Sequence, residues 1–161
     1  MGKLNYKKQL LLAGVLFTLH NIEEAAGFTR FIYPTGLNLP LPDRDSMLAS
    51  ISAITLIAWL AILWAILKKN DTNKKYLLTT LMTVFITNAF FPHIIGAIIL
   101  KRYFPAVISS IILYLPYSIW LLPKLRQSYP ATKQFILVSL TGLIITAAIT
   151  SALQLITRFI V

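Results

Sequence analysis

Two of the chain's five acidic residues stand side by side in an otherwise apolar stretch, shortly after one of its two histidines. Residues 20–24 read HNIEE, so His20 lies three residues before Glu23 and four before Glu24. On an α-helix this spacing places each carboxylate within about 60° of the imidazole. One helix face would then carry groups that can act as general acid and base, or that can ligate a divalent metal.

A membrane helix makes two adjacent glutamates costly. A charge near the bilayer centre costs on the order of 3 kcal/mol, so such groups usually face a protein interior and are paired, protonated or metal-bound. A cation bound beside Glu23 and Glu24 would offset their charge. Without a cation, at least one of them should be protonated at neutral pH. The sequence leaves both alternatives open.

A second polar pair, Asn88 and His93, lies in a later apolar stretch. Counted at about 1.5 Å per residue from the start of each stretch, both groups lie about 17–26 Å deep and therefore at one level. On a regular helix Asn88 and His93 would diverge by about 140°, so they can face one pocket only if the helix is distorted. Pro92 predicts a kink at that place. Gly27 and Gly96 predict close approach of neighbouring helices.

The rest of the sequence indicates that a membrane surrounds these residues. Apolar side chains make up 57% of the 161 residues and charged ones only 12%, against about 25% charged residues in soluble domains. Five apolar stretches have the length of a membrane span, about 20 residues: 9–28, 47–67, 76–100, 104–122 and 135–157. We therefore predict an all-α fold, a single integral-membrane domain over residues 1–161 with about five transmembrane helices.

The first stretch has a second interpretation, because three lysines precede a short apolar segment, as in a signal peptide. Two glutamates beside the cleavage position suit a peptidase poorly, so we predict a retained helix. The chain has no cysteine, which excludes disulfides, cysteine nucleophiles and thiolate metal sites.

The net charge of +10 has the same explanation as the apolar stretches. Lysines and arginines gather at the ends of these stretches, which is typical of membrane faces and argues against nucleic acid as a partner. Their distribution predicts a cytoplasmic N-terminus and an external C-terminus in a bacterial-type plasma membrane, with Lys101 and Arg102 as the exception. The loop from Thr29 to Ser46 is either a lid over an external site or, as we favour, an apolar connector. It ends, from Asp43 onward, in residues typical of a helix N-cap.

Other polar residues are expected to pack helices without chemistry; they are Ser109, Ser110, Thr146 and Ser151. Tyr114, Tyr117 and Gln154 could line a cavity around the site. No internal repeat is visible, so the sequence shows no sign of the inverted repeats on which many transporters are built.

Residues 20–24 also carry a family resemblance. The HNIEE run resembles the motif of the HXXEE family of small, largely uncharacterised membrane proteins, and Asn88 and His93 match its later asparagine and histidine. The resemblance covers most of the chain and implies a multi-span fold and a catalytic role for these polar residues, but no substrate. A weaker likeness links the glutamate pair to the glutamate-dependent CAAX proteases of membranes. The arginine that those proteases have four residues after the second glutamate is replaced here by Phe28, so that likeness is one of chemistry only.

The residues favour an intramembrane enzyme, a hydrolase or transferase acting on a lipidic or prenyl-type substrate that enters from the bilayer. In one mechanism Glu23 or Glu24 activates water as a general base. His20 and His93 then orient the water or protonate the leaving group, and Asn88 stabilises the oxyanion.

In the other mechanism one zinc or iron ion is bound in an open site, and a glutamate that does not ligate it is the base. The candidate metal ligands are His20, Glu23, Glu24 and His93. A small proton-coupled carrier that uses the same residues as an ion relay is the alternative function, followed by a membrane scaffold. As partners we expect membrane lipids and a lipidic small molecule, with a homo-oligomer left open.

Overall fold

The computed structural model describes residues 4–31 and 43–160, the side chains of residues 158–160 excepted. The first two helices are α1 (Tyr6–Phe28) and α2 (Arg44–Leu67). The third segment runs from α3 (Asp71–Asn88) through the π-helical η1 (Ala89–Ile94) into α4 (Ile95–Leu100). The fourth consists of α5 (Val107–Ser109), the π-helical η2 (Ser110–Tyr114) and α6 (Leu115–Gln127), and α7 (Thr132–Ile160) is the fifth. The described residues contain no strand, which confirms the all-α prediction.

Polar side chains set where the helices begin. Asn5 accepts a hydrogen bond from the backbone N–H of Lys8, and Asp43 accepts one from that of Ser46. The cap at Asp43 was expected from the sequence. Several helices extend beyond the predicted apolar stretches by up to five residues, because capping and basic residues continue the helical turns into polar surroundings. The fourth segment instead begins at Val107, three residues after the predicted start at 104, because Ala106 has a left-handed backbone with φ 61°. The remainder of the predicted lid or connector, residues 32–42, lies outside the described residues.

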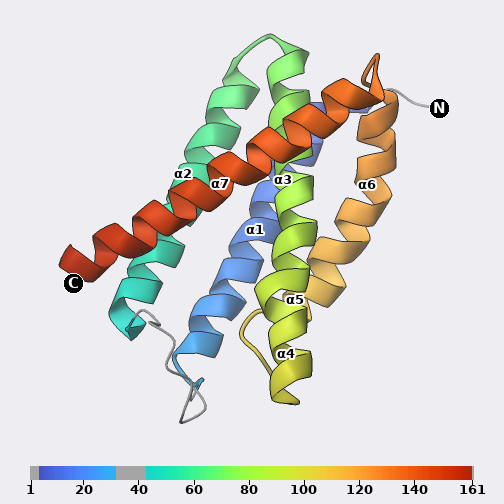
Figure 1. Cartoon of the computed structure of the whole chain (residues 1–161). Coiled ribbons are helices and arrows are strands. Elements are labelled where there is room, and N and C mark those ends of the chain that lie inside the picture. The colour runs from blue at the N-terminus through green and yellow to red at the C-terminus, as the bar shows by residue number, and fades with distance from the viewer. Residues whose placement is uncertain (1–3, 32–42, 161) are drawn as a thin grey trace.

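Helix α1 is packed against both α2 and α3, and α6 is packed on α3 (Figure 1). Helix α7 crosses α2 and α3 obliquely. The fully buried apolar side chains of this bundle include Leu10, Ile62, Met82, Phe85 and Leu121. The predicted retained helix therefore contributes to the centre of the core.

The bundle has apolar side chains on its outer surface and polar ones inside. Leu67, Ile99 and Ile144 are 82%, 70% and 68% exposed, whereas His20 and His93 are fully buried. Within the described residues, four helices are long and apolar enough to cross a membrane: Arg44–Leu67, Asp71–Leu100, Val107–Gln127 and Thr132–Thr157. Helix α1, with 23 residues, has a comparable length but carries the polar run. By length and composition the chain fits an integral membrane protein.

The third segment is bent where Pro92 interrupts it. Phe91 has an extended backbone, with φ −127° and ψ 119°, between helical residues. Proline cannot donate the backbone hydrogen bond of a regular helix, and π-helical turns are frequent at functional sites. The bend confirms the predicted distortion. It also brings η1 against η2, the irregular part of the fourth segment.

Candidate functional site

Two histidines from different segments meet inside the bundle. His20 belongs to α1 and His93 to η1, and their ring centroids are 4.8 Å apart. Asn88, at the end of α3, lies between them: its Nδ2 is 3.0 Å from His20 Nε2 and 3.2 Å from His93 Nε2. The bend at Pro92 thus turns Asn88 and His93 toward one point, as the sequence required.

The opposite ring nitrogens show which atoms carry protons. His93 Nδ1 lies 2.6 Å from the carbonyl oxygen of Pro105, which can only accept, so Nδ1–H is the donor. His20 Nδ1 lies 2.9 Å from Ser109 Oγ, whose own hydrogen points to the carbonyl oxygen of Ala106 at 3.2 Å. In both neutral rings the lone pair therefore resides on Nε2. The Asn88 amide has two hydrogens, one for each of these acceptors.

Glu24 completes the cluster without a hydrogen-bond donor of its own. Its Oε1 lies 4.0 Å from His93 Nε2, and its side chain is only 18% exposed. Over residues 4–31 and 43–160, no group donates a hydrogen bond to this carboxylate. His20, Glu24 and His93 each offer one ligand atom, and these atoms lie within 4.8 Å of one another. A mostly buried carboxylate with no donor is unusual, because desolvation penalises its charge.

Glu23, the neighbouring carboxylate, does not join this cluster. Its Oε1 accepts from Tyr103 Oη at 2.9 Å and from the backbone N–H of Ile108 at 3.2 Å. Its Oε2 accepts from the backbone N–H of Ser109 at 2.6 Å. These N–H groups belong to the first turn of α5, which has no partner inside its own helix for them. Adjacent residues on a helix point about 100° apart, so Glu23, for which catalytic and metal-binding roles were predicted, lies outside the group formed by His20, Glu24 and His93.

A short segment, residues 103–109, surrounds the cluster and was not expected from the sequence. It supplies the Pro105 carbonyl to His93 and the Ser109 hydroxyl to His20, and it holds the donors to Glu23. From its sequence context Ser109 was expected to pack helices only. Its position at the start of the fourth segment, at the level of the glutamates, was the one signal that could have singled it out.

Gly27 allows this segment to approach α1. A Cβ at Gly27 would lie 2.8 Å from Pro105 Cβ and 2.9 Å from Pro105 Cα, closer than side chains tolerate. Gly96 lies in the same way against the ring of Phe104. Both glycines confirm the predicted close approach.

Tyr114 packs against the ring of His20. Its ring stacks on that imidazole with centroids 4.1 Å apart and on Phe85 at 3.8 Å. Tyr117 lies away from the cluster, where its hydroxyl donates to Gln9. Of the three residues that could line a cavity, Gln154 does so.

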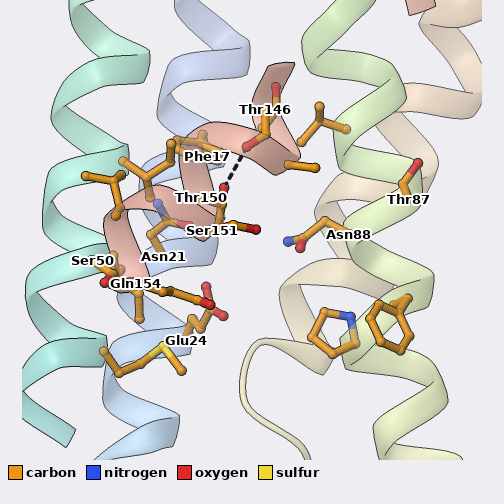
Figure 2. A pocket seen from close by; sticks show the side chains of 18 of the residues that line it. Phe17, Asn21, Glu24, Ser50, Thr87, Asn88, Thr146, Thr150, Ser151 and Gln154 are labelled. Carbon is orange, nitrogen blue, oxygen red and sulfur yellow. Dashed lines mark hydrogen bonds between the residues drawn. The ribbon is translucent and has the colours of Figure 1, made fainter. Parts of the chain in front are cut away.

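A cavity of about 420 Å³ opens in front of Glu24 and Asn88 (Figure 2). In Figure 2 these two side chains reach toward it from α1 and α3. Helix α7 adds a polar edge, with Thr146, Thr150, Ser151 and Gln154. The apolar lining includes Phe17, Phe28, Met47, Ile51, Ile54, Val84, Phe91 and Leu143. This volume is within the range of small-molecule pockets, about 300–1,000 Å³.

Comparison with known proteins gives one match. A family model described as "Protein of unknown function with HXXEE motif" matches residues 11–121, which is more than half of the chain. No curated protein and no solved structure matches the chain.

Proposed function

We propose that this chain, which belongs to the family of proteins of unknown function with an HXXEE motif, is an intramembrane hydrolase or transferase acting on a lipidic, prenyl-type substrate. One observation carries the proposal. A carboxylate without a donor, Glu24, and the His20–Asn88–His93 network meet at one end of a largely apolar cavity. Reactive groups at the polar end of an apolar pocket suit a substrate with a hydrocarbon chain and a polar head.

The cavity supports a lipidic substrate by its position as well as its lining. It lies between α1, α2, α3 and α7, helices that carry many exposed apolar side chains on their outer faces. A hydrocarbon chain can occupy the apolar part, next to Phe17, Ile54 and Leu143. The head group would then lie between Asn88 and Glu24, with the hydroxyl groups of α7 on the other side.

Two chemistries use this arrangement. In the first, Glu24 takes a proton from water or from an acceptor hydroxyl. The oxygen of that water or hydroxyl attacks the substrate, and the bond to the leaving group breaks. The proton passes from Glu24 to His93 Nε2, 4.0 Å away, and on to the leaving group. Once His93 Nε2 holds the proton it no longer accepts from Asn88, and the released N–H can donate to the oxygen on which negative charge develops. In the second, a bound cation activates the water and Glu24 is one of its ligands.

The proposal is tested by mass spectrometry of lipid extracts from cells that produce the chain. We expect at least one lipid to be formed or consumed with the wild type and to stay unchanged with Glu24→Gln, which keeps the shape and removes the charge. Ser110→Ala is the control, because Ser110 Oγ is buried and has no hydrogen-bond partner in the described part of the chain. Identical extracts, together with Glu24-dependent proton flux in vesicles, would replace the enzyme with a carrier.

A further inference from the structure

Three electron-pair donors converge in the site, and a single amide group separates two of them. His20 Nε2 and His93 Nε2 carry lone pairs because both Nδ1 atoms donate to oxygen acceptors. The third donor is the Glu24 carboxylate. Atoms within 4.8 Å of one another need shifts of less than about 1 Å to reach the metal distances of 2.0–2.2 Å found for zinc with nitrogen and oxygen ligands.

The surroundings of the histidines are those of metal ligands. A ligating histidine usually donates its other ring N–H to a carbonyl, carboxylate or similar acceptor, which fixes the ring and raises the basicity of the ligating nitrogen. Pro105 and Ser109 provide such acceptors here at 2.6 and 2.9 Å. The two acceptors come from residues 103–109, so this one segment orients both rings.

A cation would also balance the charge of the site. Glu24 is mostly buried, and the two neutral imidazoles offer it lone pairs instead of protons. Glu23 cannot compensate, because its carboxylate is itself negative and its hydrogen bonds are made elsewhere. A divalent ion would bind the carboxylate and both lone pairs at once.

We infer that His20 Nε2, His93 Nε2 and Glu24 bind one divalent metal ion, best matched by zinc, and that Asn88 turns away from the two histidines when the ion binds. Three protein ligands of this type leave a fourth position for water, which is the pattern of catalytic zinc sites. This position would face the cavity, where Glu24 and Asn88 already lie. The inference rests on the proposed function, since it selects the second of the two chemistries. A bound ion would lower the pKa of the water, so that its proton could pass to solvent without Glu23 as the base.

The test is metal content and affinity of the full-length chain purified in detergent, titrated with zinc alone. We expect one zinc ion per chain for the wild type. Affinity should fall at least tenfold in His20→Ala, His93→Ala and Glu24→Gln. Ser110→Ala is the matched control, because its buried hydroxyl has no hydrogen-bond partner in the described part of the chain, and it should bind one zinc ion with the affinity of the wild type. Less than about a tenth of an ion in the wild type, or equal binding by Glu24→Gln and the wild type, would overturn the inference.

A second variant distinguishes loss of zinc binding from loss of folding. Asn88→Ala removes the amide between the histidines and leaves all three ligands, so zinc should bind at least as tightly as in the wild type. A clear loss of zinc in well-folded Asn88→Ala would contradict the assigned role of this residue. Cobalt provides a spectroscopic check, since four-coordinate Co²⁺ absorbs strongly in the visible range and the Glu24→Gln protein should lack that absorption.

The two proposals fail in different ways. A chain without zinc whose lipid chemistry still depends on Glu24 would leave the enzyme and exclude the metal. A chain with stoichiometric zinc and unchanged cellular lipids would leave the metal and exclude the enzyme.

Discussion

Glu23 and Glu24 are neighbours in sequence, yet they lie on two different sides of helix α1. Glu23 faces residues 103–109, where one hydroxyl and two backbone N–H groups donate to it. Glu24 faces the cavity, where the described residues provide no donor and His93 lies 4.0 Å away. The two glutamates thus differ in their surroundings: hydrogen bonds hold Glu23, whereas Glu24 accepts none from the described residues.

The two sides are connected through residues 103–109. Glu23 accepts from Ser109 N–H, while the Ser109 hydroxyl accepts from His20. In the same segment, the carbonyl oxygen of Pro105 accepts from His93 Nδ1. Glu23 therefore stabilises the segment that orients the two histidines, whereas under the proposed function Glu24 is the carboxylate that reacts.

The largest effect is expected from Glu24→Gln. Loss of the charge should lower turnover of the lipid substrate by at least about a hundredfold, the usual contribution of a positioned acid or base. The thermal unfolding temperature of the metal-free protein in detergent should be unchanged or slightly higher, because a mostly buried charge is removed for which the described residues provide no donor. A variant that loses stability as much as activity would remove the contrast between the two glutamates.

Glu23→Gln should instead lower stability more than activity. A glutamine has one acceptor oxygen and no charge, so at least one N–H of the α5 turn loses its partner. We expect a loss of about 1–3 kcal/mol in the free energy of unfolding. The measurement is denaturant unfolding of both glutamine variants side by side, and equal stabilities would show that Glu23 does not hold the segment.

Ser109→Ala tests the connection between the two sides. The alanine removes the acceptor of His20 Nδ1–H and leaves the backbone N–H that binds Glu23. Loss of such an outer-shell partner typically costs tenfold to a hundredfold in metal affinity or activity. Ser110→Ala, one residue further on, should be close to the wild type in zinc affinity and in turnover of the lipid substrate. If the two alanine variants behave alike, the hydroxyl of Ser109 does not orient His20.

Tyr103→Phe should have the smallest effect. It removes one hydrogen bond to Glu23 from a side chain that is 45% exposed, so the loss in unfolding free energy should be at most about 0.5–1.5 kcal/mol.

The pH dependence of this contact gives a second readout. Burial and the Glu23 contact raise the pKa of Tyr103 from 10.0 to about 12. Because the folded-state pKa is the higher one, this stabilisation is full below about pH 10 and is lost as the pH rises through 12. The wild type and Tyr103→Phe should therefore converge in stability at high pH. A difference that stays constant across this range would show that the phenol proton is not involved.

Much of the architecture could be predicted from the sequence because its causes are local. Runs of about 20 apolar residues require helices in a membrane, and Asp43 begins α2 by accepting from Ser46. Pro92 bends the third segment wherever that segment is placed. The rise per residue alone predicts His20, Asn88 and His93 at one depth, and the structure brings the three side chains together.

The sequence by itself therefore determined an all-helical bundle, a proline-bent third segment and a set of polar residues at one depth. Which of the two adjacent glutamates faces the cavity follows from the packing of the segments, since it depends on the neighbour that each one meets. It also decided that the Pro105 carbonyl and the α5 N–H groups take part. Every residue carries a carbonyl, and nearly every residue an N–H, so no residue type marks them in advance. Their roles follow from the path of the chain, which brings residues 103–109 against Gly27.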